Sequence, residues 1–458
     1  MGSTSNNIQG KKGCQFSQLL RGVNFEQVLL VAIDAAKFLP KALICNYFGD
    51  IIDHSFFFSV DKPGLNLCLA KLEKAKATFN IERVFIGIEA TGHYYEDIVR
   101  FFTSHGYTVA IINAATTHEE RSSALNWCKT DDRDLVAIAY SLKNNKATQS
   151  QLPTGHYRQL LALTRARRQE IRKRSVIRIE IRNLMDKIFR PFQGLVSLHH
   201  NRPKKVRIFS DFFGKSSLWF LKNAPHSSDI LRLGEPGLRR ISKEHNLKLR
   251  QTTIQKLLQA AQCAYSLSKA ELEPELLLLQ LKLSDLTRLD DNIDRLEKEM
   301  EILLLQTDGY LLLTIPGIGA VTAAELFSEI GDISNFDSAS QLIKKAGTNP
   351  MVRQSGGQKG YYGRITKQGN KHLRYVLYQA GRNICRHNID LKPFFDRLKQ
   401  KGKHSKVIFI AMGNKLLKIV FAMLTKKQPF HSKTAKTIIK NEVLKKLRHQ
   451  KSLELLSA

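Results

Sequence analysis

The chain has 458 residues, of which 43% are hydrophobic, so it is long enough for about two to four domains with packed cores. Lys and Arg number 72 against 41 Asp and Glu, which gives a formal charge of +31. A charge of this size indicates a polyanionic partner, and a nucleic-acid phosphate backbone is the obvious one. A membrane is the rival polyanion, but no apolar run approaches the roughly 20 residues of a spanning helix, and residues 1–25 hold no signal-peptide core. The cysteines form no CxxC pair, which argues against a zinc site or a disulfide framework and fits a reducing cytoplasm.

A polar tail over 1–25 precedes a segment in which strand and helix patterns alternate. Three apolar runs, at 28–36, 42–47 and 55–60, are separated by turn signals and predict a three-stranded meander. Further along, the pattern predicts a helix over 65–79, a strand over 84–89, a helix over 94–104, a strand over 107–112 and a helix over 131–143. This alternation is typical of an α/β sheet domain, which we expect to span 26–150.

Four acidic residues of this domain stand at positions that suit a metal site. Asp34 follows five apolar residues directly, and Glu89 ends the apolar run that begins at Val84. A carboxylate inside a buried strand costs several kcal/mol unless a partner such as a divalent cation compensates it. Asp131 and Asp134 are three residues apart, so a helix places both carboxylates on one face.

Together the four carboxylates suit two Mg²⁺ ions about 4 Å apart, the arrangement used for in-line displacement at phosphorus. Hard oxygen ligands select Mg²⁺, and Mn²⁺ can substitute for it. Each acid also has a structural alternative: Asp131 after Thr130 is a candidate helix N-cap, and Glu89 a strand-end turn residue. The neighbouring Asp132 is expected to be a surface residue. The joint pattern favours the metal site, and Asp34 is the hardest acid to explain structurally.

Residues 151–308 are predicted to form a basic helical region that contains an insertion. Residues 151–155 include Pro and Gly and predict a linker, and the helical segment 157–190 carries 11 Lys or Arg against 3 Asp or Glu. Residues 200–270 predict a helical insertion, and a heptad-like seam of apolar residues follows over 279–306. The seam fits two arrangements equally well. One is an amphipathic helix within its own domain, and the other is an antiparallel or intersubunit coiled coil with 157–190.

Glycine-rich turns mark the segment 309–430, which precedes a Lys-rich tail over 431–458. Gly317 and Gly319, in the sequence Pro-Gly-Ile-Gly, are typical of a helix-hairpin-helix motif, in which glycines let backbone N–H groups approach a phosphate. A plain connection between two helices has the same pattern. Two longer helical patterns follow, over 369–388 and 404–424.

Ser355 lies in a second glycine-rich loop, 354–363, among cationic residues. The stretch from 353 to 374 holds six Lys or Arg and no acidic residue: Arg353, Lys359, Arg364, Lys367, Lys371 and Arg374. Such a serine is a reasonable nucleophile toward phosphorus, because the cations stabilise charge on the phosphate and the glycines permit close approach. The alternative is a phosphate-binding loop in which Ser355 only donates a hydrogen bond. The chemistry of the residues alone favours this alternative.

The order of these motifs resembles the DEDD transposases of bacterial insertion sequences, a group that includes the Piv-type site-specific invertases. The first block of similar residues comprises Ala32-Ile33-Asp34, Ile88-Glu89-Ala90-Thr91-Gly92-His93-Tyr94 and Lys129-Thr130-Asp131-Asp132-Arg133-Asp134. The second block comprises Ile315-Pro316-Gly317-Ile318-Gly319, Ala346-Gly347-Thr348-Asn349-Pro350, Ser355-Gly356, and Ile365-Thr366-Lys367-Gln368-Gly369-Asn370 with Leu373-Arg374. The resemblance covers nearly the whole chain, and two blocks in this order are quite specific.

The resemblance implies a RuvC-like RNase H fold, a central coiled-coil segment and a helical C-terminal transposase domain. Asp34, Glu89, Asp131 and Asp134 match the family's metal ligands. Ser355 matches the serine that forms a transient phosphoserine link to DNA, and this match replaces the passive role that chemistry alone favours. The insertion near 195–275 is longer than we expect for the family, so it leaves the topology of the central region open.

The expected function is that of a bacterial, cytoplasmic and nucleoid-associated transposase or site-specific recombinase. Its expected partners are DNA at the element ends and target, further copies of the chain in a dimer or tetramer, and a structured guide RNA, but no membrane. Five arginines of the basic helix are candidates for RNA contact: Arg165, Arg167, Arg168, Arg172 and Arg174. Two alternatives remain, namely a RuvC-like Holliday-junction nuclease that uses metal-activated water and a non-enzymatic RNA-binding scaffold.

Overall fold

The structure, a computed structural model, describes residues 22–90, 92–123, 130–144, 148–149, 152–199, 202–353 and 361–431. The chain divides into two compact units, Met1–Thr154 and Gly155–Ala458. The division falls within the predicted linker 151–155. The other domain boundaries expected from the sequence, at 308 and 430, stay predictions.

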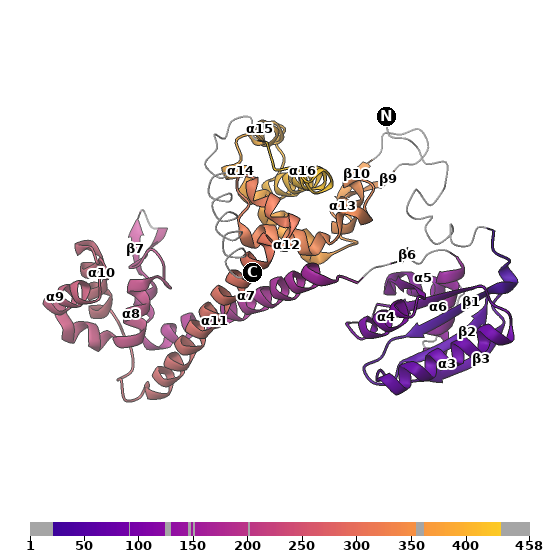
Figure 1. The fold of residues 1–458 in the computed structure, drawn as a ribbon. Coiled ribbons are helices and arrows are strands. Elements are labelled where there is room, and N and C mark those ends of the chain that lie inside the picture. Colours follow the sequence, from indigo (N-terminus) through magenta and orange to yellow (C-terminus); the bar gives the residue numbers. More distant parts are fainter. Residues whose placement is uncertain are drawn as a thin grey trace, which may run out of the picture. The chain divides into compact units, whose positions relative to one another are not determined.

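The N-terminal unit contains a six-stranded mixed sheet whose strands lie in the order β3-β2-β1-β4-β5-β6 (Figure 1). The strands are β1 (Val28–Asp34), β2 (Lys41–Asn46), β3 (Ile51–Phe57), β4 (Arg83–Glu89), β5 (Thr108–Ile112) and β6 (Thr148–Gln149). The first three form the antiparallel meander that the sequence predicts, and β4 and β5 run parallel to β1. The two-residue strand β6 was not predicted.

Helices cover both faces of this sheet, and alternate side chains of β1 are therefore buried on opposite sides. One face, with Leu29, Val31 and Ile33, packs against α3 (Lys62–Thr78) and α4 (Tyr95–Ser104). The other face, with Val28, Leu30 and Ala32, packs against α6 (Asp131–Lys143). A polar helix, α5 (Ala114–Ser123), lies beside α6 and was not predicted. A short 3₁₀ helix, η1 (Phe25–Gln27), precedes β1.

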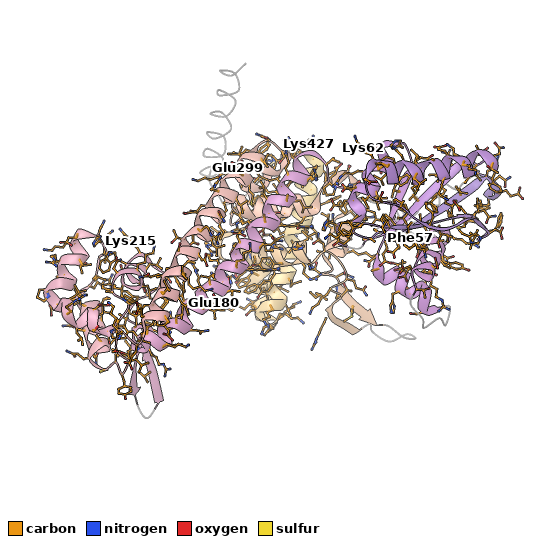
Figure 2. The ribbon with its side chains drawn as sticks, turned by 90° about the horizontal axis from the view of Figure 1, so that it is seen from below. Phe57, Lys62, Glu180, Lys215, Glu299 and Lys427 are labelled. Atoms are coloured by element: carbon orange, nitrogen blue, oxygen red, sulfur yellow. The ribbon has the colours of Figure 1, made fainter. Side chains whose placement is uncertain are left out.

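The second unit is organised by two long antiparallel helices, α7 (Gly155–Ile188) and α11 (Glu273–Leu305), which lie side by side in Figure 1. Ion pairs fix their register: Arg167 with Glu297 at 2.7 Å, Arg174 with Asp290 at 2.8 Å, and Lys282 with Glu180 at 2.6 Å. Residue numbers rise along one helix as they fall along the other, so the pairing is antiparallel and within one chain. Glu180 and Glu299, one on each helix, are labelled in Figure 2.

The insertion joins the far ends of α7 and α11 and has a hydrophobic core of its own. It consists of η2 (Arg190–Gln193), β7 (Leu195–His199), β8 (Arg202–Val206), α8 (Lys215–Asn223), α9 (Ser227–Glu244) and α10 (Gln251–Gln262). The predicted helical character is found, together with the β7–β8 hairpin. A kink interrupts α9 at Gly234, whose φ of +58° suits glycine, two residues before Pro236.

The C-terminal part of the second unit is mainly helical, and its core also takes in Leu160 of α7 and Met300 of α11. Its elements are η3 (Asp308–Thr314), α12 (Ala320–Ile330), η4 (Ile333–Asn335), α13 (Ala339–Ala346), β9 (Pro350–Arg353), β10 (Tyr361–Ile365), α14 (Lys371–His387), α15 (Lys392–Gln400) and α16 (Ser405–Lys426). The two helices predicted over 369–388 and 404–424 are found as α14 and α16.

The sequence expectation that no apolar run approaches the length of a spanning helix is wrong for α16. This helix has 22 residues, and an 18-residue stretch within it has a mean hydropathy of 1.9, so by length and composition it is apolar enough to cross a membrane. Its Met412, Leu416 and Val420 are fully buried in the C-terminal core. The core helix of a folded domain meets the same criteria, and the apolar character of α16 is accounted for by this packing.

Candidate active site

Asp34 and Glu89 end two neighbouring parallel strands of the N-terminal sheet. Ile33 of β1 pairs with Ile88 of β4, and each acid follows its paired isoleucine directly. Side chains alternate along β1, so Leu30, Ala32 and Asp34 face the side of the sheet opposite to α3. Glu89 has the same orientation, so both carboxylates stand on the sheet face that α6 covers.

The first turn of α6 is held at the same end of the sheet. Lys41 of β2 pairs with Asp34 of β1, and its Nζ lies 2.6 Å from a carboxylate oxygen of Asp132. The pKa of Asp132 is lowered, first by this hydrogen bond from Lys41 and then by one from Ser55 of β3. Asp132 is therefore more than the surface residue that the sequence predicts. It ties the start of α6 to β2 and β3 beside Asp34.

Asp131 and Asp134 lie in this same first turn, with Asp134 buried and Asp131 exposed. The N-cap of α6 is Thr130, whose side chain accepts a hydrogen bond from the backbone N–H of Arg133. The structural alternative for Asp131, a helix N-cap, is therefore wrong. The helix packs closely on the sheet at Gly87, where an added Cβ would lie 2.7 Å from a methyl carbon of Leu142.

Glu89 has a partner that the sequence did not reveal. The hydroxyl of Thr117, a fully buried residue of α5, donates a hydrogen bond of 2.7 Å to a carboxylate oxygen of Glu89. This contact fixes the orientation of the carboxylate at the end of β4. Sequence patterns do not reveal this hydrogen bond, because α5 has a polar sequence without helical periodicity and Thr117 is distant from Glu89 along the chain.

The donor set of Asp34, Glu89, Asp131 and Asp134 fits hard divalent cations by its chemistry, since all four are carboxylates at one end of the sheet. Among the residues that the structure describes, no three His, Cys, Asp or Glu side chains converge closely enough to hold a metal ion. Carboxylates repel one another at short range. The four acids therefore share an edge without forming a closed cage, and binding would require them to approach a common centre.

Ser355 and Lys359 lie outside the described residues, between the strands β9 and β10. Arg353 of β9 pairs with Tyr361 of β10 across an antiparallel ladder. Thr366, which follows β10, donates from its backbone N–H and its hydroxyl to Asn349, both at 3.0 Å. These contacts anchor the base of the hairpin that carries the loop.

The cationic residues after the loop divide into two groups. Arg364, Lys367 and Lys371 have exposed side chains that are available to a phosphate. Arg374 instead donates 2.9 Å and 3.1 Å hydrogen bonds to the backbone carbonyls of Ala346 and Lys367. The predicted role of Arg374 in binding nucleic acid thus competes with a structural one.

Gly317 and Gly319 lie in the turn between η3 and α12. Gly317 has φ of +91° and faces α14, where an added Cβ would lie 3.3–3.4 Å from atoms of Asn383, Ile384 and His387. Gly319 is the N-cap of α12 and opens on a pocket that Asp294, Glu297 and Glu301 of α11 help to line. Lys298 also lines the pocket, but the three carboxylates outnumber it and would repel a phosphate, so the packing of the turn favours the helix-connector alternative over phosphate binding.

Four of the five arginines predicted to contact RNA form ion pairs inside the second unit. Arg165 contacts Glu329 at 3.2 Å, and Arg167 and Arg168 contact the two carboxylate oxygens of Glu325 at 3.4 Å and 3.3 Å. Arg174 pairs with Asp290 of α11, as described above. The fifth, Arg172, is exposed. Glu325 and Glu329 are both buried in α12, and the sequence analysis missed them.

His372 joins this buried network and should make the stability of the second unit depend on pH. Its Nδ1 accepts a 2.8 Å hydrogen bond from Arg168, which requires a neutral ring at that nitrogen. Burial lowers the pKa of His372 from its ordinary value of 6.5; Glu329 acts in the opposite direction, while Arg165 and Arg168 add to the lowering. A lowered folded-state pKa gives stability that is present above 6.5 and is lost as pH falls through the folded-state value.

We therefore expect the melting temperature of the second unit to fall as pH drops below about 6.5. In the variant His372→Gln, whose amide oxygen also accepts from Arg168, this part of the pH dependence should disappear. Calorimetric melting of both proteins between neutral pH and pH 5 measures the difference. Parallel curves for the two proteins would contradict the assignment.

The mixed sheet with its row of acids and the helical C-terminal domain together define a DNA-recombining enzyme of the transposase class. The chain belongs to the DEDD-type insertion-sequence transposases. Residues 31–190 match a family of DEDD transposases of the IS110 type, described as "Transposase". Residues 309–396 match the "Transposase IS116/IS110/IS902 family". The insertion lies between the two matched segments, and the family expected from the motifs is confirmed.

Relatives of several kinds agree with this assignment. The pilin gene-inverting protein of Moraxella lacunata is 27% identical over 354 residues, which covers 77% of this chain and 83% of the relative. The transposase for insertion sequence element IS1328 of Yersinia enterocolitica is 31% identical over 149 residues, covering 30% of this chain and 41% of the relative. An uncharacterized 44.8 kDa protein of insertion element IS116 from Streptomyces clavuligerus is 21% identical over 402 residues, covering 87% of this chain and 95% of the relative.

Proposed function

We propose that this transposase cuts and rejoins DNA strands of an insertion sequence with the four carboxylates of a RuvC-like domain and with Ser355 as nucleophile. The observation that carries the proposal is the position of Asp34 and Glu89. They end adjoining parallel strands, on the face covered by the helix that carries Asp131 and Asp134. The strand order, with an antiparallel β3-β2-β1 meander followed by parallel β4 and β5, supports an RNase H-like fold.

In this proposal Asp34, Glu89, Asp131 and Asp134 hold two Mg²⁺ ions, for which Mn²⁺ can substitute. When bound, such ions polarise a phosphoryl oxygen and stabilise the charge that develops during displacement. The protein contributes the alignment of the carboxylates. Thr117 orients Glu89, and the Lys41–Asp132 ion pair fixes the turn that carries Asp131 and Asp134.

The proposed chemistry at Ser355 is a transesterification. The serine oxygen forms a bond to phosphorus and loses its proton to a base, while the bond from phosphorus to the departing sugar oxygen breaks and that oxygen takes up a proton. One phosphodiester is exchanged for another, so religation needs no ATP. The exposed cations Arg364, Lys367 and Lys371 follow the loop and are suited to stabilise the charge on the phosphate.

The proposed partners follow from the charge of +31 and from the family. They are DNA at the element ends and at the target, further copies of the chain in a dimer or tetramer, and a structured guide RNA. The exposed Arg172 on α7 is the member of the predicted arginine set whose side chain is most available to RNA. We propose a cytoplasmic, nucleoid-associated enzyme.

Two other functions make different demands on the same residues. A Holliday-junction nuclease that uses metal-activated water would need the four acids but not Ser355. A non-enzymatic RNA scaffold would bind nucleic acid equally well with or without Mg²⁺ and after substitution of Asp34. The buried orientation of Asp134 toward the acidic edge and the shared face of Asp34 and Glu89 favour an enzyme over a scaffold.

Trapping of a covalent protein–DNA adduct tests the proposal. Wild type and Ser355→Ala are incubated with Mg²⁺, the element-end DNA and the element's noncoding RNA, and adducts are separated on a denaturing gel. We expect an adduct with wild type that is absent with Ser355→Ala and in the presence of EDTA. Cleavage without an adduct that Ser355→Ala leaves unchanged would overturn the serine assignment in favour of the nuclease.

A further inference from the structure

An exposed aromatic ring extends the row of residues at the acidic end of the sheet. Phe57, labelled in Figure 2, is the last residue of β3 and pairs with Lys41 of β2, which in turn pairs with Asp34 of β1. Phe57 is 55% exposed, so its ring is accessible to a partner. Phe57 therefore stands two strands away from Asp34, along the same cross-strand row.

Phe57 also stands on the same face as the acids. Its neighbour Phe56 packs into the core on the side of α3, so the alternation of the strand turns Phe57 toward the side of α6. Lys41 connects the two: its Nζ lies 5.2 Å from the centre of the Phe57 ring and 2.6 Å from the carboxylate of Asp132. A fixed cation thus lies between an exposed ring and the turn that carries Asp131 and Asp134.

We propose that Phe57 stacks an unpaired nucleobase of the DNA strand whose backbone is held at the acidic edge. Base stacking on an aromatic ring tolerates any sequence, because every base has a π face. Lys41, whose side chain is only 14% exposed, holds the ring in place through its cation–π contact while it pairs with Asp132. The inference rests on the proposed function and adds the state of the substrate, a locally unpaired strand.

The charges around the ring favour a nucleotide over a protein partner. An apolar protein surface placed on Phe57 would also cover Lys41 and Asp132, whose side chain is 65% exposed, and would remove that charge from water at a cost. A nucleobase presents a flat apolar face that can cover the ring alone and leave the carboxylate of Asp132 in water. A second copy of this chain, docked on the β3 edge, is the occupant that the test must exclude.

The test measures binding of a single-stranded oligonucleotide containing 2-aminopurine, with Ca²⁺ present to neutralise the carboxylates and with every variant carrying Ser355→Ala, so that no DNA–serine bond can form. Stacking on a protein ring changes the fluorescence of 2-aminopurine. We expect Phe57→Ala to weaken binding by about tenfold or more and to remove the fluorescence change, and Phe57→Trp to preserve both. The matched control is Phe48→Ala, which removes a ring that is 56% exposed in the turn at the opposite end of the β2–β3 hairpin.

Three results would overturn the inference. They are equal binding by Phe57→Ala and wild type, equal weakening by Phe57→Ala and Phe48→Ala, and a lower oligomeric state of Phe57→Ala in light scattering. Circular dichroism verifies that each variant is folded. If Phe57→Ala does not fold, the comparison of Phe57→Trp with wild type still tests the proposal. Because binding is measured without cleavage and in the absence of Ser355, a failed adduct experiment and a failed stacking experiment can be told apart.

Discussion

The variant Asp34→Asn is expected to cleave element-end DNA about a thousandfold or more slowly in Mg²⁺ than wild type, because metal-ion stabilisation of a phosphoryl transfer is worth several kcal/mol and each ~1.4 kcal/mol is a factor of ten. Asparagine keeps the shape of the side chain but removes the charge that a cation needs. Without Mg²⁺, the same variant should melt at a higher temperature than wild type. One of several like charges at the edge of the sheet has been removed, and a functional site is commonly a source of instability.

The matched control is Asp53→Asn, which removes a carboxylate from β3 of the same sheet. Asp53 pairs with Lys71 of α3 at 2.8 Å, on the face away from α6. Rates of strand cleavage and metal-free melting curves for both variants separate the two roles, since the control should keep its activity and gain no stability. An Asp34→Asn protein that cleaves at the wild-type rate would remove Asp34 from the site.

The sheet of the N-terminal unit was predictable because its strands are apolar throughout. Both faces of β1 and β4 are covered by helices, so their sequences are nearly continuous apolar runs in which Asp34 and Glu89 are conspicuous. Strand β6 could not be predicted because two residues are too few to show a periodic pattern. Helix α5 could not be predicted because its sequence is polar and shows no apolar face. The supporting contacts of Thr117 and Asp132 depend on pairs far apart in the chain, and local periodicity does not report such pairs.

The arginines of α7 have structural partners that the sequence does not reveal, and their contact with RNA stays a prediction. A carboxylate in an apolar run needs a partner, and this rule identified Asp34. It applies equally to Glu325 and Glu329, which lie in the apolar helix α12 and are buried. Their partners are arginines of α7 that the sequence analysis assigned to RNA. The rule identifies a buried acid but not its counter-charge, because a guanidinium and a metal ion compensate it equally well.

The insertion was the least predictable part, for a physical reason. Its helices pack on the ends of α7 and α11, and its core includes Ile181 and Met185 of the first and Leu279 and Leu283 of the second. Its apolar pattern therefore follows from the helical pair rather than from a self-contained repeat. Neither of the matched transposase families extends into it, so the resemblance carried no information about its topology.

Replacing Glu325 by alanine is expected to destabilise the second unit by roughly 3–5 kcal/mol, the usual cost of leaving a buried charge without its partner. Its two carboxylate oxygens each contact one guanidinium, and the side chains of Arg167 and Arg168 are only 16% and 12% exposed. Burial raises the pKa of Glu325 even though Arg168 and Arg167 act in the opposite direction. Removing the acid would leave Arg168 without a carboxylate partner and Arg167 with Glu297 alone.

A second carboxylate on the same arginine provides the control. Glu297 of α11 contacts Arg167 at 2.7 Å, but its side chain is 35% exposed, so Glu297→Ala should cost no more than about 1 kcal/mol. Calorimetric melting measures both losses, and hydrogen exchange of the α12 amides tells whether the loss arises there. The shorter contact would then be the weaker one, because burial of the charges, rather than distance, sets the cost of separating them. Equal destabilisation by the two variants would contradict this account and would show that Glu325 is not the acid that holds α7 against α12.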